Sequence, residues 1–386
     1  MDLQALRTRY LDELTGSVIP FWMKHGVDRE YGGFLTCLDR DGSVFDDRKY
    51  IWMQGRGVWS FAKFYNDVER NPEWLEIARR GAEFLERYAF DPQGRCWFST
   101  TRDGSQPVWY QRKPYAAVFA VLGFLEYAKA SGDAKYTELA LDLFQHIRRW
   151  IAEPALLDRP FASAESSADC MVILSMAIEI FLATGNAKCR NIVRECLLEA
   201  GKFYDPDRGI LQEFPHATGD TPEGRLFCPG SSIEVAWFLI HGEEAISEPG
   251  PDRTARIHKW LDVIEASLEL GWDNEFGGLY YFMDLAGKPT LQLESSMKLW
   301  WPHTEALYGC VLGLVETGDE KWARWLERVD AYAFRHFADP EYGEWFGYCD
   351  RQGNLTHTLK GNNYKGCFHV PRALLLSAQR IGQSEA

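Results

Sequence analysis

The amino-acid sequence predicts an all-α fold, a single (α/α)6 barrel over residues 1–386 in which six helix pairs close into a ring. Three observations favour this fold class. A short phrase recurs along the chain, the segments between its copies carry apolar residues at helical spacing, and Gly-Asp or Gly-Asn turns join several of these segments. A repeat of this length is too long for one helix and fits a helix pair, which is typical of a repetitive helical architecture.

The recurring phrase opens with Asp and carries a Gly shortly before an aromatic or apolar residue. The clear copies are DREYGGF at 28–34, DPQGRCW at 91–97, DPDRGIL at 205–211, DNEFGGL at 273–279 and DPEYGEW at 339–345. A degenerate sixth copy falls at 158–161, and successive copies then begin 47 to 68 residues apart. Because the phrase is rich in turn residues, we expect each copy to lie in a long loop.

Helical periodicity between the phrases indicates about twelve helices. Val118, Leu122 and Leu125, for example, follow Pro114 at the spacing of one helix face. The expected helices cover residues 2–25, 51–66, 72–88, 114–131, 134–151, 166–184, 187–202, 231–246, 251–268, 296–317, 319–336 and 364–381.

Short turns and long loops alternate along this series. Gly132-Asp133, Gly185-Asn186 and Gly318-Asp319 are read as turns from the second helix of one pair to the first of the next. The long loops contain mixed apolar and polar runs such as 33–38, which suggest short β-hairpins at one mouth of the barrel. An open solenoid is the structural alternative, because six repeats do not prove closure.

Composition narrows the classes of function. The net charge of −14 disfavours nucleic acid and anionic lipid surfaces as partners. The N-terminus does not resemble a signal peptide, and no apolar run is read as reaching the roughly 18 to 20 residues that span a bilayer, so we expect a cytoplasmic protein with no membrane partner. Nine cysteines are scattered without zinc-ligand spacing and are expected to be reduced and mostly buried.

Aromatic residues are abundant, with 15 Trp, 17 Tyr and 23 Phe. They suit either the apolar faces of sugar rings or plain packing between helices. The N-terminal ends of the even-numbered helices should face the mouth with the long loops, where free N–H groups favour oxygen-rich ligands. The residues at these ends are Arg56, Gln111, Arg112, the segments 165–169 and 231–234, His303 and His369.

Two of these residues are histidines. His369 stands near Gly366 and Pro371, and His303 precedes Glu305, which offers a carboxylate partner for acid–base work. A lone histidine in either place is equally compatible with a structural role. Neither position alone decides between the two.

Several segments together resemble one family. DDRKYIWMQGR (46–56), KLWWPHTEA (298–306), DPEYGEWFGY (339–348) and KGCFHVPR (365–372) are similar to segments of N-acylglucosamine 2-epimerases, the family that includes the animal renin-binding proteins. The similarity runs from about residue 21 to residue 372. It implies the (α/α)6 barrel, an isomerase of carbohydrate metabolism that moves the proton at C2 of a ring-opened aldose or N-acyl hexosamine, and a possible homodimer.

The resemblance also implies roles for particular residues. His369 matches the C-terminal catalytic histidine of the family, Arg56 matches its arginine near the carbonyl or ring oxygens, and His303 is a candidate for the second proton transfer. The matching pocket positions that would bind substrate are Trp52, Glu213, Ser231, Glu234, Trp301, Glu305 and Trp345.

One family motif departs from its pattern here. The second catalytic histidine of the family stands in a PGHxxE motif, which reads Pro229-Gly230-Ser231-Ser232-Ile233-Glu234 in this chain. A serine hydroxyl is too weak an acid or base to replace imidazole unaided, and Ser231 with Glu234 fits a helix capping box. A second departure is Ala116-Ala117, where the family's epimerases carry a polar and an acidic residue.

These observations leave three enzymatic interpretations and one interpretation without catalysis. The first is a sugar 2-epimerase with His369 as one base and His303 or a pocket carboxylate as the other, and the second is an aldose–ketose isomerase with one base. An inverting glycoside hydrolase or unsaturated uronyl hydrolase also uses this barrel, and a sugar-binding relic is the alternative without catalysis. The sequence shows no phosphate-binding glycine loop and no metal-ligand cluster, so we expect no cofactor, no metal and no nucleotide effector.

Overall fold

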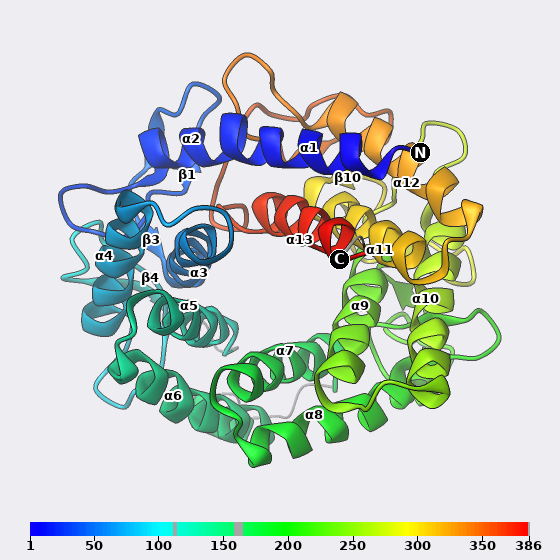
Figure 1. Ribbon diagram of the computed structural model, residues 1–386, viewed down its shortest axis with the longest axis horizontal. Helices are drawn as coiled ribbons and strands as arrows, with labels where there is room; N and C mark the ends of the chain where they lie inside the picture. The colour runs from blue at the N-terminus through cyan, green and yellow to red at the C-terminus, as the bar shows by residue number, and fades with distance from the viewer. Residues whose placement is uncertain (111–113, 158–164, 385–386) are drawn as a thin grey trace.

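The computed structural model describes residues 1–110, 114–157 and 165–384, and it confirms the predicted ring of helices (Figure 1). Two concentric layers form the ring. The inner helices are α3 (Ile51–Asp67), α5 (Tyr115–Ser131), α7 (Ser167–Thr184), α9 (Pro229–Ile246), α11 (Trp300–Thr317) and α13 (His369–Gln383). The outer helices are α4 (Pro72–Tyr88), α6 (Ala134–Ala152), α8 (Ala187–Glu199), α10 (Pro251–Gly271), α12 (Glu320–His336) and the N-terminal α1 (Leu3–Glu13) with α2 (Ile19–Phe21).

The two ends of the chain close the ring. Arg7 of α1 donates from Nε to the Ala378 carbonyl of α13 at 3.2 Å, so the first helix is the outer partner of the last. On the inner layer, Gln379 of α13 donates to Asp67 of α3 at 2.9 Å. The barrel is therefore closed, and the alternative of an open solenoid is wrong.

Short turns lie within the packed pairs, which corrects the predicted pairing. Gly132 ends α5 with a φ of 76° and Asp133 begins α6, where its carboxylate accepts from the Lys135 N–H at 3.0 Å. Only a residue without Cβ adopts such a φ readily, and an Asp at the N-cap satisfies a free N–H. Because α5 packs on α6, the turn joins inner to outer helix of one pair, and the sixth pair is α13 with α1.

The N-terminal helix contains two π-helical turns, Leu14–Val18 and Trp22–Gly26, on either side of α2. Pro20 lies in the short α2 between them and has no N–H to donate, which disrupts the regular α-helical bonding pattern around it. The predicted helix over 2–25 is thus present as one run with wider turns. It stays on the outer layer, and its C-terminal end leads into the first long loop.

Two inner helices begin later than predicted, at Trp300 and His369 in place of residues 296 and 364. Lys298–Leu299 forms strand β10, which pairs with β11 (Tyr348–Cys349). The segment before α13 is held by a buried ion pair between Lys365 and Glu344, 2.8 Å from Nζ to Oε1. These tertiary contacts outweigh helical periodicity, and they place His369 at the first residue of its helix.

Short strands decorate the mouth. Three pairings are local hairpins as expected, namely β1 (Cys37–Leu38) with β2 (Val44–Asp46), β4 (Trp97–Thr100) with β5 (Pro107–Tyr110), and β6 (Tyr204–Asp205) with β7 (Ile210–Leu211). The others join different loops: β3 (Lys49–Tyr50) with β4, β8 (Leu226–Phe227) with β9 (Met283–Asp284), and β10 with β11. The loops therefore support one another around the ring.

The recurring Asp is a structural residue of these loops. Asp273 accepts from the Glu275 N–H at 3.0 Å, from buried Lys298 at 3.1 Å and from Arg351 of the next long loop at 2.9 Å. Asp28 and Asp339 are bonded in the same way to a buried lysine and to an arginine from a neighbouring loop. The sixth copy of the phrase, at 158–161, lies outside the described residues.

One helix bears on the expectation about membranes. The inner helix α7 is long and apolar enough to cross a bilayer by length and composition, so the expectation that no such segment exists is wrong by that measure. Half of its residues are buried inside the ring, where it packs on α5, α8 and α9, and an inner helix of a barrel needs an apolar composition on most sides. All nine cysteines are buried and unpaired.

Candidate active site

A cavity of about 620 Å³ lies at the mouth of the barrel, where the long loops meet the first turns of the inner helices. Its ionisable lining groups include Arg56, Glu234, Glu294, His369 and Arg372, and aromatic rings such as Trp52 and Trp301 stand among them. The cavity has the size and the mixture of apolar walls and few polar groups that small-molecule sites have.

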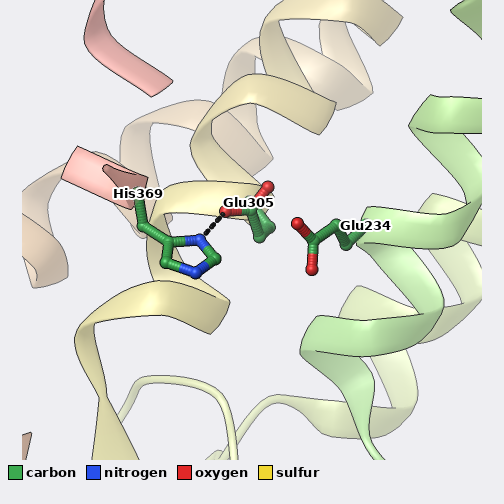
Figure 2. Close-up of side chains that lie close together, drawn as sticks. All are labelled: Glu234, Glu305 and His369. Atoms are coloured by element: carbon green, nitrogen blue, oxygen red, sulfur yellow. Dashed lines mark hydrogen bonds and ion pairs between the residues drawn. The ribbon is translucent and has the colours of Figure 1, made fainter. Parts of the chain in front are cut away.

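Three side chains from three inner helices converge (Figure 2): Glu234 and His369 line the cavity, and Glu305, predicted to bind substrate, is outside its lining. His369 donates or accepts through Nδ1 at 2.8 Å from Glu305 Oε1, and Glu234 faces the same point from α9. Arg372 links the two carboxylates, because one of its nitrogens donates to Glu234 at 2.5 Å and to Glu305 at 2.7 Å. Residues three apart share a helix face, so α13 presents His369 and Arg372 together.

Carboxylate partners define the protonation state of His369. Glu305 also accepts from the Trp237 indole at 3.0 Å. Burial raises the pKa of Glu305, and the charge of Arg372 and these hydrogen bonds oppose that shift by stabilising the ionised carboxylate. Because Oε1 of an ionised Glu305 can only accept, we assign the imidazole proton to Nδ1, and Arg372 lies 3.3 Å from the same nitrogen. Burial, and then the charges of Arg56 and Arg372, lower the pKa of His369 well below its usual value. The ring is therefore neutral at pH 7.

The other ring nitrogen of His369 is the chemically available one. Nε2 has no hydrogen-bond partner within the described residues, and the side chain lines the cavity. An Nδ1-protonated imidazole has its lone pair on Nε2, so this nitrogen is a base. His369 is the one histidine among the cavity-lining residues that the structure describes.

Arg56 supplies an uncompensated positive charge beside this base. Its guanidinium lies 4.1 Å from the ring centre of Phe119 and 4.9 Å from those of Trp52 and Phe368, and its hydrogen bond to the Tyr364 carbonyl is long, at 3.4 Å. Nε is buried without a partner in the described part of the chain. Burial and the charge of Arg372 lower the pKa of Arg56 to about 9, so it remains charged at neutral pH. It is suited to hold an oxyanion.

The cluster also has the ligand types of a metal site. Ligand atoms of Glu234, Glu305 and His369 lie within 4.8 Å of one another. Arg372 already occupies the space between the two carboxylates, however, and its pKa is raised because their charges outweigh the effect of burial. A cation would have to displace this guanidinium, so the cluster is better suited to orient the imidazole than to coordinate a metal ion.

His303 does not take part in this cluster, which contradicts its predicted catalytic role. It is fully buried, Nδ1 lies 2.6 Å from the Leu299 carbonyl, and Nε2 accepts from the Leu279 N–H at 2.9 Å. Tyr332 stacks on the ring at 5.0 Å. Burial lowers the pKa of His303 to about 3. Both nitrogens are thus used by the backbone, and the residue connects a long loop to the start of α11.

Trp345 and Glu213 are likewise outside the cavity lining. Trp345 is fully buried, and its indole donates to Glu13 of α1 at 3.0 Å, so its predicted role in binding substrate is wrong. The backbone carbonyl of Glu213 accepts from Ser167 at 3.0 Å. The charge of Glu213 contributes to the raised pKa of Tyr281, a cavity residue, so Glu213 lies near the lining without being part of it.

Ser231 is not the start of a capping box. The helix α9 begins two residues earlier, at Pro229, with Cys228 as its N-cap and without a side-chain cap. Proline is well suited to the first turn because its missing N–H would be unbonded there. Glu234 is free of any capping function and binds Arg372 instead. Ser231 lies on the helix face of Glu234 and Phe238, beside the cavity but outside its lining.

Other residues expected at the mouth have mixed outcomes. Gln111 and Arg112 lie outside the described residues. In the segment 165–169, Asp169 accepts from the Tyr115 hydroxyl at 2.7 Å and from the Ser166 N-cap, a structural arrangement. Trp52, Arg56, Glu234, Trp301 and His369 line the cavity together.

The sequence reasoning missed Arg372 and Tyr281. Arg372 lies within the quoted segment KGCFHVPR, and its spacing of three residues from His369 could have placed both side chains on one helix face. Tyr281 follows a loop phrase and carries no local signal, because its place in the cavity depends on how the 273–297 loop folds.

The buried imidazole of His369, its carboxylate partner and the Arg56 guanidinium in one cavity of an (α/α)6 barrel are groups suited to an enzyme that moves protons at carbon. Residues 33–371 match the N-acylglucosamine 2-epimerase (GlcNAc 2-epimerase) family. The N-acylglucosamine 2-epimerase of Mus musculus is 38% identical over 98% of this chain and 93% of its own length, and that of Homo sapiens is 37% identical over 98% and 91%. The chain belongs to the N-acylglucosamine 2-epimerase family, and it is an isomerase.

Solved structures share the fold. A cellobiose 2-epimerase from Bacillus thermoamylovorans B4167 superposes with a TM-score of 0.83 at 20% identity, covering 98% of this chain and all of the other. A D-mannose isomerase superposes with a TM-score of 0.81 at 17% identity, covering 96% and 97%. At these identities the similarity establishes the common barrel.

Proposed function

We propose that this protein is a sugar 2-epimerase in which His369 removes the proton from C2 of a ring-opened aldose or N-acyl hexosamine. One observation carries the proposal: Nε2 of the carboxylate-held imidazole of His369 opens into the same cavity as the guanidinium of Arg56, which has no carboxylate partner in the described residues. A base and an oxyanion binder are the two groups that proton abstraction beside a carbonyl requires.

The first half-reaction balances with these two residues. The C2 proton moves to Nε2 of His369, the electron pair of the C2–H bond becomes the C1–C2 double bond, and the C1 carbonyl pair moves onto O1. The resulting enediolate oxygen lies against Arg56, whose charge has no carboxylate partner in the described residues. Because Arg56 is buried, its charge is more stabilising there than it would be in bulk water.

Glu305 and Arg372 act on the base and not on the substrate. Glu305 holds Nδ1–H, which keeps the lone pair on Nε2, and it stabilises the imidazolium formed after proton abstraction. Arg372 fixes Glu305 and Glu234 from one side. Both are positioning residues, and the imidazole needs them because a rotated ring would direct Nε2 away from the substrate.

Epimerisation also needs a proton for the opposite face of C2, and we assign this step to Tyr281. Its phenol lines the cavity and has no hydroxyl partner among the described residues, and its ring packs on Trp301 at 6.1 Å. Burial, and after it the neighbouring Cys228 thiol and the charge of Glu294, raises the pKa of Tyr281, so the phenol keeps its proton until the enediolate takes it. Cys228 is the N-cap of α9, three residues before Ser231.

Aldose–ketose isomerisation is the second candidate, because His369 is the one histidine among the described lining residues and Ser231 replaces the family's second one. A single base can return the proton to C1 on the same face. Glycoside hydrolysis is disfavoured, because Glu234 and Glu305 are both bound to Arg372 and leave no place for a water between an acid and a base.

The test is incubation in heavy water with a panel of N-acyl hexosamines and neutral hexoses, followed by NMR of the products. We expect deuterium at C2 of a new epimer, and the loss of this exchange in His369→Gln. Tyr281→Phe should retain exchange but form little epimer. Deuterium at C1 of a ketose would establish isomerisation, and binding without exchange on any sugar would mean a non-catalytic relic.

The cytoplasmic location and the homodimer stay predictions. Cell fractionation and light scattering on the purified protein test them directly.

A further inference from the structure

The cavity has two walls of different chemistry. Arg56, His369 and Arg372 lie on α3 and α13. Val118 and Leu122 come from α5, which packs beside α3, and Met171 and Val172 come from α7. Figure 1 shows α5 and α7 on the opposite side of the barrel axis from α13. We call the second set, with Phe238 of α9, the apolar wall.

The apolar wall is not simply packing between helices. Met171 and Phe238 are only half-buried although they are on inner helices, and the open side of each faces the cavity. The polar side chain on this wall, Ser175, already donates to the Val172 carbonyl at 3.0 Å. Ala116 and Ala117, which precede Val118, are buried and carry no polar group.

A sugar hydroxyl placed against this wall would lose its water without finding a partner. Such unpaired burial weakens binding by about five- to a hundredfold or more for each group. A methylene in the same place instead gains affinity, by about fourfold each. The reacting carbons have to lie at His369 and Arg56, so the part of the ligand that reaches α5 and α7 should be apolar.

We propose that the substrate is a sugar with an apolar substituent longer than an acetyl group, namely an extended N-acyl chain, and that the apolar wall binds this substituent. The inference rests on the proposed function for the position of the reacting carbons. It makes Met171, Val172 and Phe238 residues that determine specificity, without contact to the atoms that react.

The experiment uses N-acetyl, N-butanoyl and N-hexanoyl mannosamine. Binding is measured by calorimetry on the full-length His369→Gln protein, and turnover on the wild type. We expect the affinity to rise by about fifteenfold from acetyl to butanoyl, which adds two methylenes, and to rise further with hexanoyl. In the wild type, kcat/KM should follow the same order.

Matched variants locate the effect. Met171→Gln, which preserves size and adds an amide to the apolar wall, should reduce the preference for butanoyl over acetyl to less than threefold. Met297→Gln makes the same change elsewhere in the cavity lining, before α11, and should leave the preference unchanged. Val172→Thr is a second variant of nearly equal volume, and thermal melting shows that each protein is folded.

The experiments can refute the inference about the apolar wall and the proposed function separately. If N-acetyl mannosamine is epimerised but affinity is flat or falls with chain length, the inference about the apolar wall is wrong and the proposed function stands. If affinity rises with chain length and Met171→Gln removes the rise, the inference stands even when no sugar in the series exchanges deuterium, and the proposed function is then wrong. Equal effects of Met171→Gln and Met297→Gln would also overturn the inference.

Discussion

Replacing either of two buried histidines by glutamine should have opposite consequences. His369 faces the cavity with Nε2 and is held through Nδ1 by Glu305, whereas His303 uses both nitrogens to bind the backbone of Leu279 and Leu299. His369→Gln removes the base and leaves an amide that can still donate to Glu305. His303→Gln removes two buried hydrogen bonds and no group that the substrate meets.

The magnitudes follow from these contacts. A positioned general base contributes roughly 10²- to 10⁴-fold, so exchange at C2 should fall by at least 10² in His369→Gln, with stability within about 1 kcal/mol of the wild type. In His303→Gln a buried N–H and a buried carbonyl each lose their partner, at about 1–3 kcal/mol each. The free energy of unfolding should therefore fall by about 2–6 kcal/mol, with kcat changed only a few-fold.

Two measurements on each variant separate the roles. Urea unfolding followed by tryptophan fluorescence gives the free energy of unfolding, and deuterium incorporation at C2 gives the chemical rate of the folded protein. A fully folded His303→Gln protein without exchange would restore His303 to the chemistry. Wild-type exchange in His369→Gln would refute the assignment of the base.

Three further outcomes are expected. Glu305→Gln should lower kcat by roughly 10²-fold or more, since the amide holds the imidazole tautomer less firmly, and an unchanged rate in a folded variant would remove Glu305 from the mechanism. Ser231→His should raise C2 epimerisation of N-acyl hexosamines or neutral hexoses by roughly 10²- to 10⁴-fold, whereas a loss of activity would show that the serine serves a mechanism of its own. The free energy of unfolding should decrease by about 1.4 kcal/mol per pH unit for His303 as the pH falls from about 6.5 towards 3. The reason is that the imidazole binds a proton in the unfolded protein and does not bind it in the folded protein, where its pKa is about 3. His303→Gln should lack this contribution in urea titrations at pH 7 and pH 5.

Much of the barrel follows from local rules in the sequence. The helix α4 spans Pro72–Tyr88 as predicted, since Asn71 caps it and its apolar residues recur at helical spacing. The turn at Gly132-Asp133 is where the sequence indicated it, because a left-handed residue and an N-cap are properties of two neighbouring residues. Family motifs likewise indicated His369, Arg56 and Glu305 as residues of one site.

Local rules were insufficient wherever a distant segment competes. The helices predicted from 296 and 364 begin at Trp300 and His369, because Lys298–Leu299 pairs with a strand some 50 residues later and Lys365 binds Glu344. Periodicity measures how well a segment would fit a helix. It does not register a strand or an ion pair offered by another part of the chain.

Local sequence rules also could not separate the reactive residues of the site from structural ones. Position in the sequence made His303 and His369 equal candidates, and the resemblance added Trp345, since imidazole and indole serve both in cores and in pockets. Their hydrogen-bond partners distinguish them: the backbone of Leu279 for His303, Glu13 for Trp345, and Glu305 for His369. The sequence alone thus determines the helices, their turns and the chemical types present, because these depend on neighbours along the chain. Whether a buried polar group is structural or reactive depends on which distant residue satisfies it, and that is settled only when the ring closes and brings such residues together.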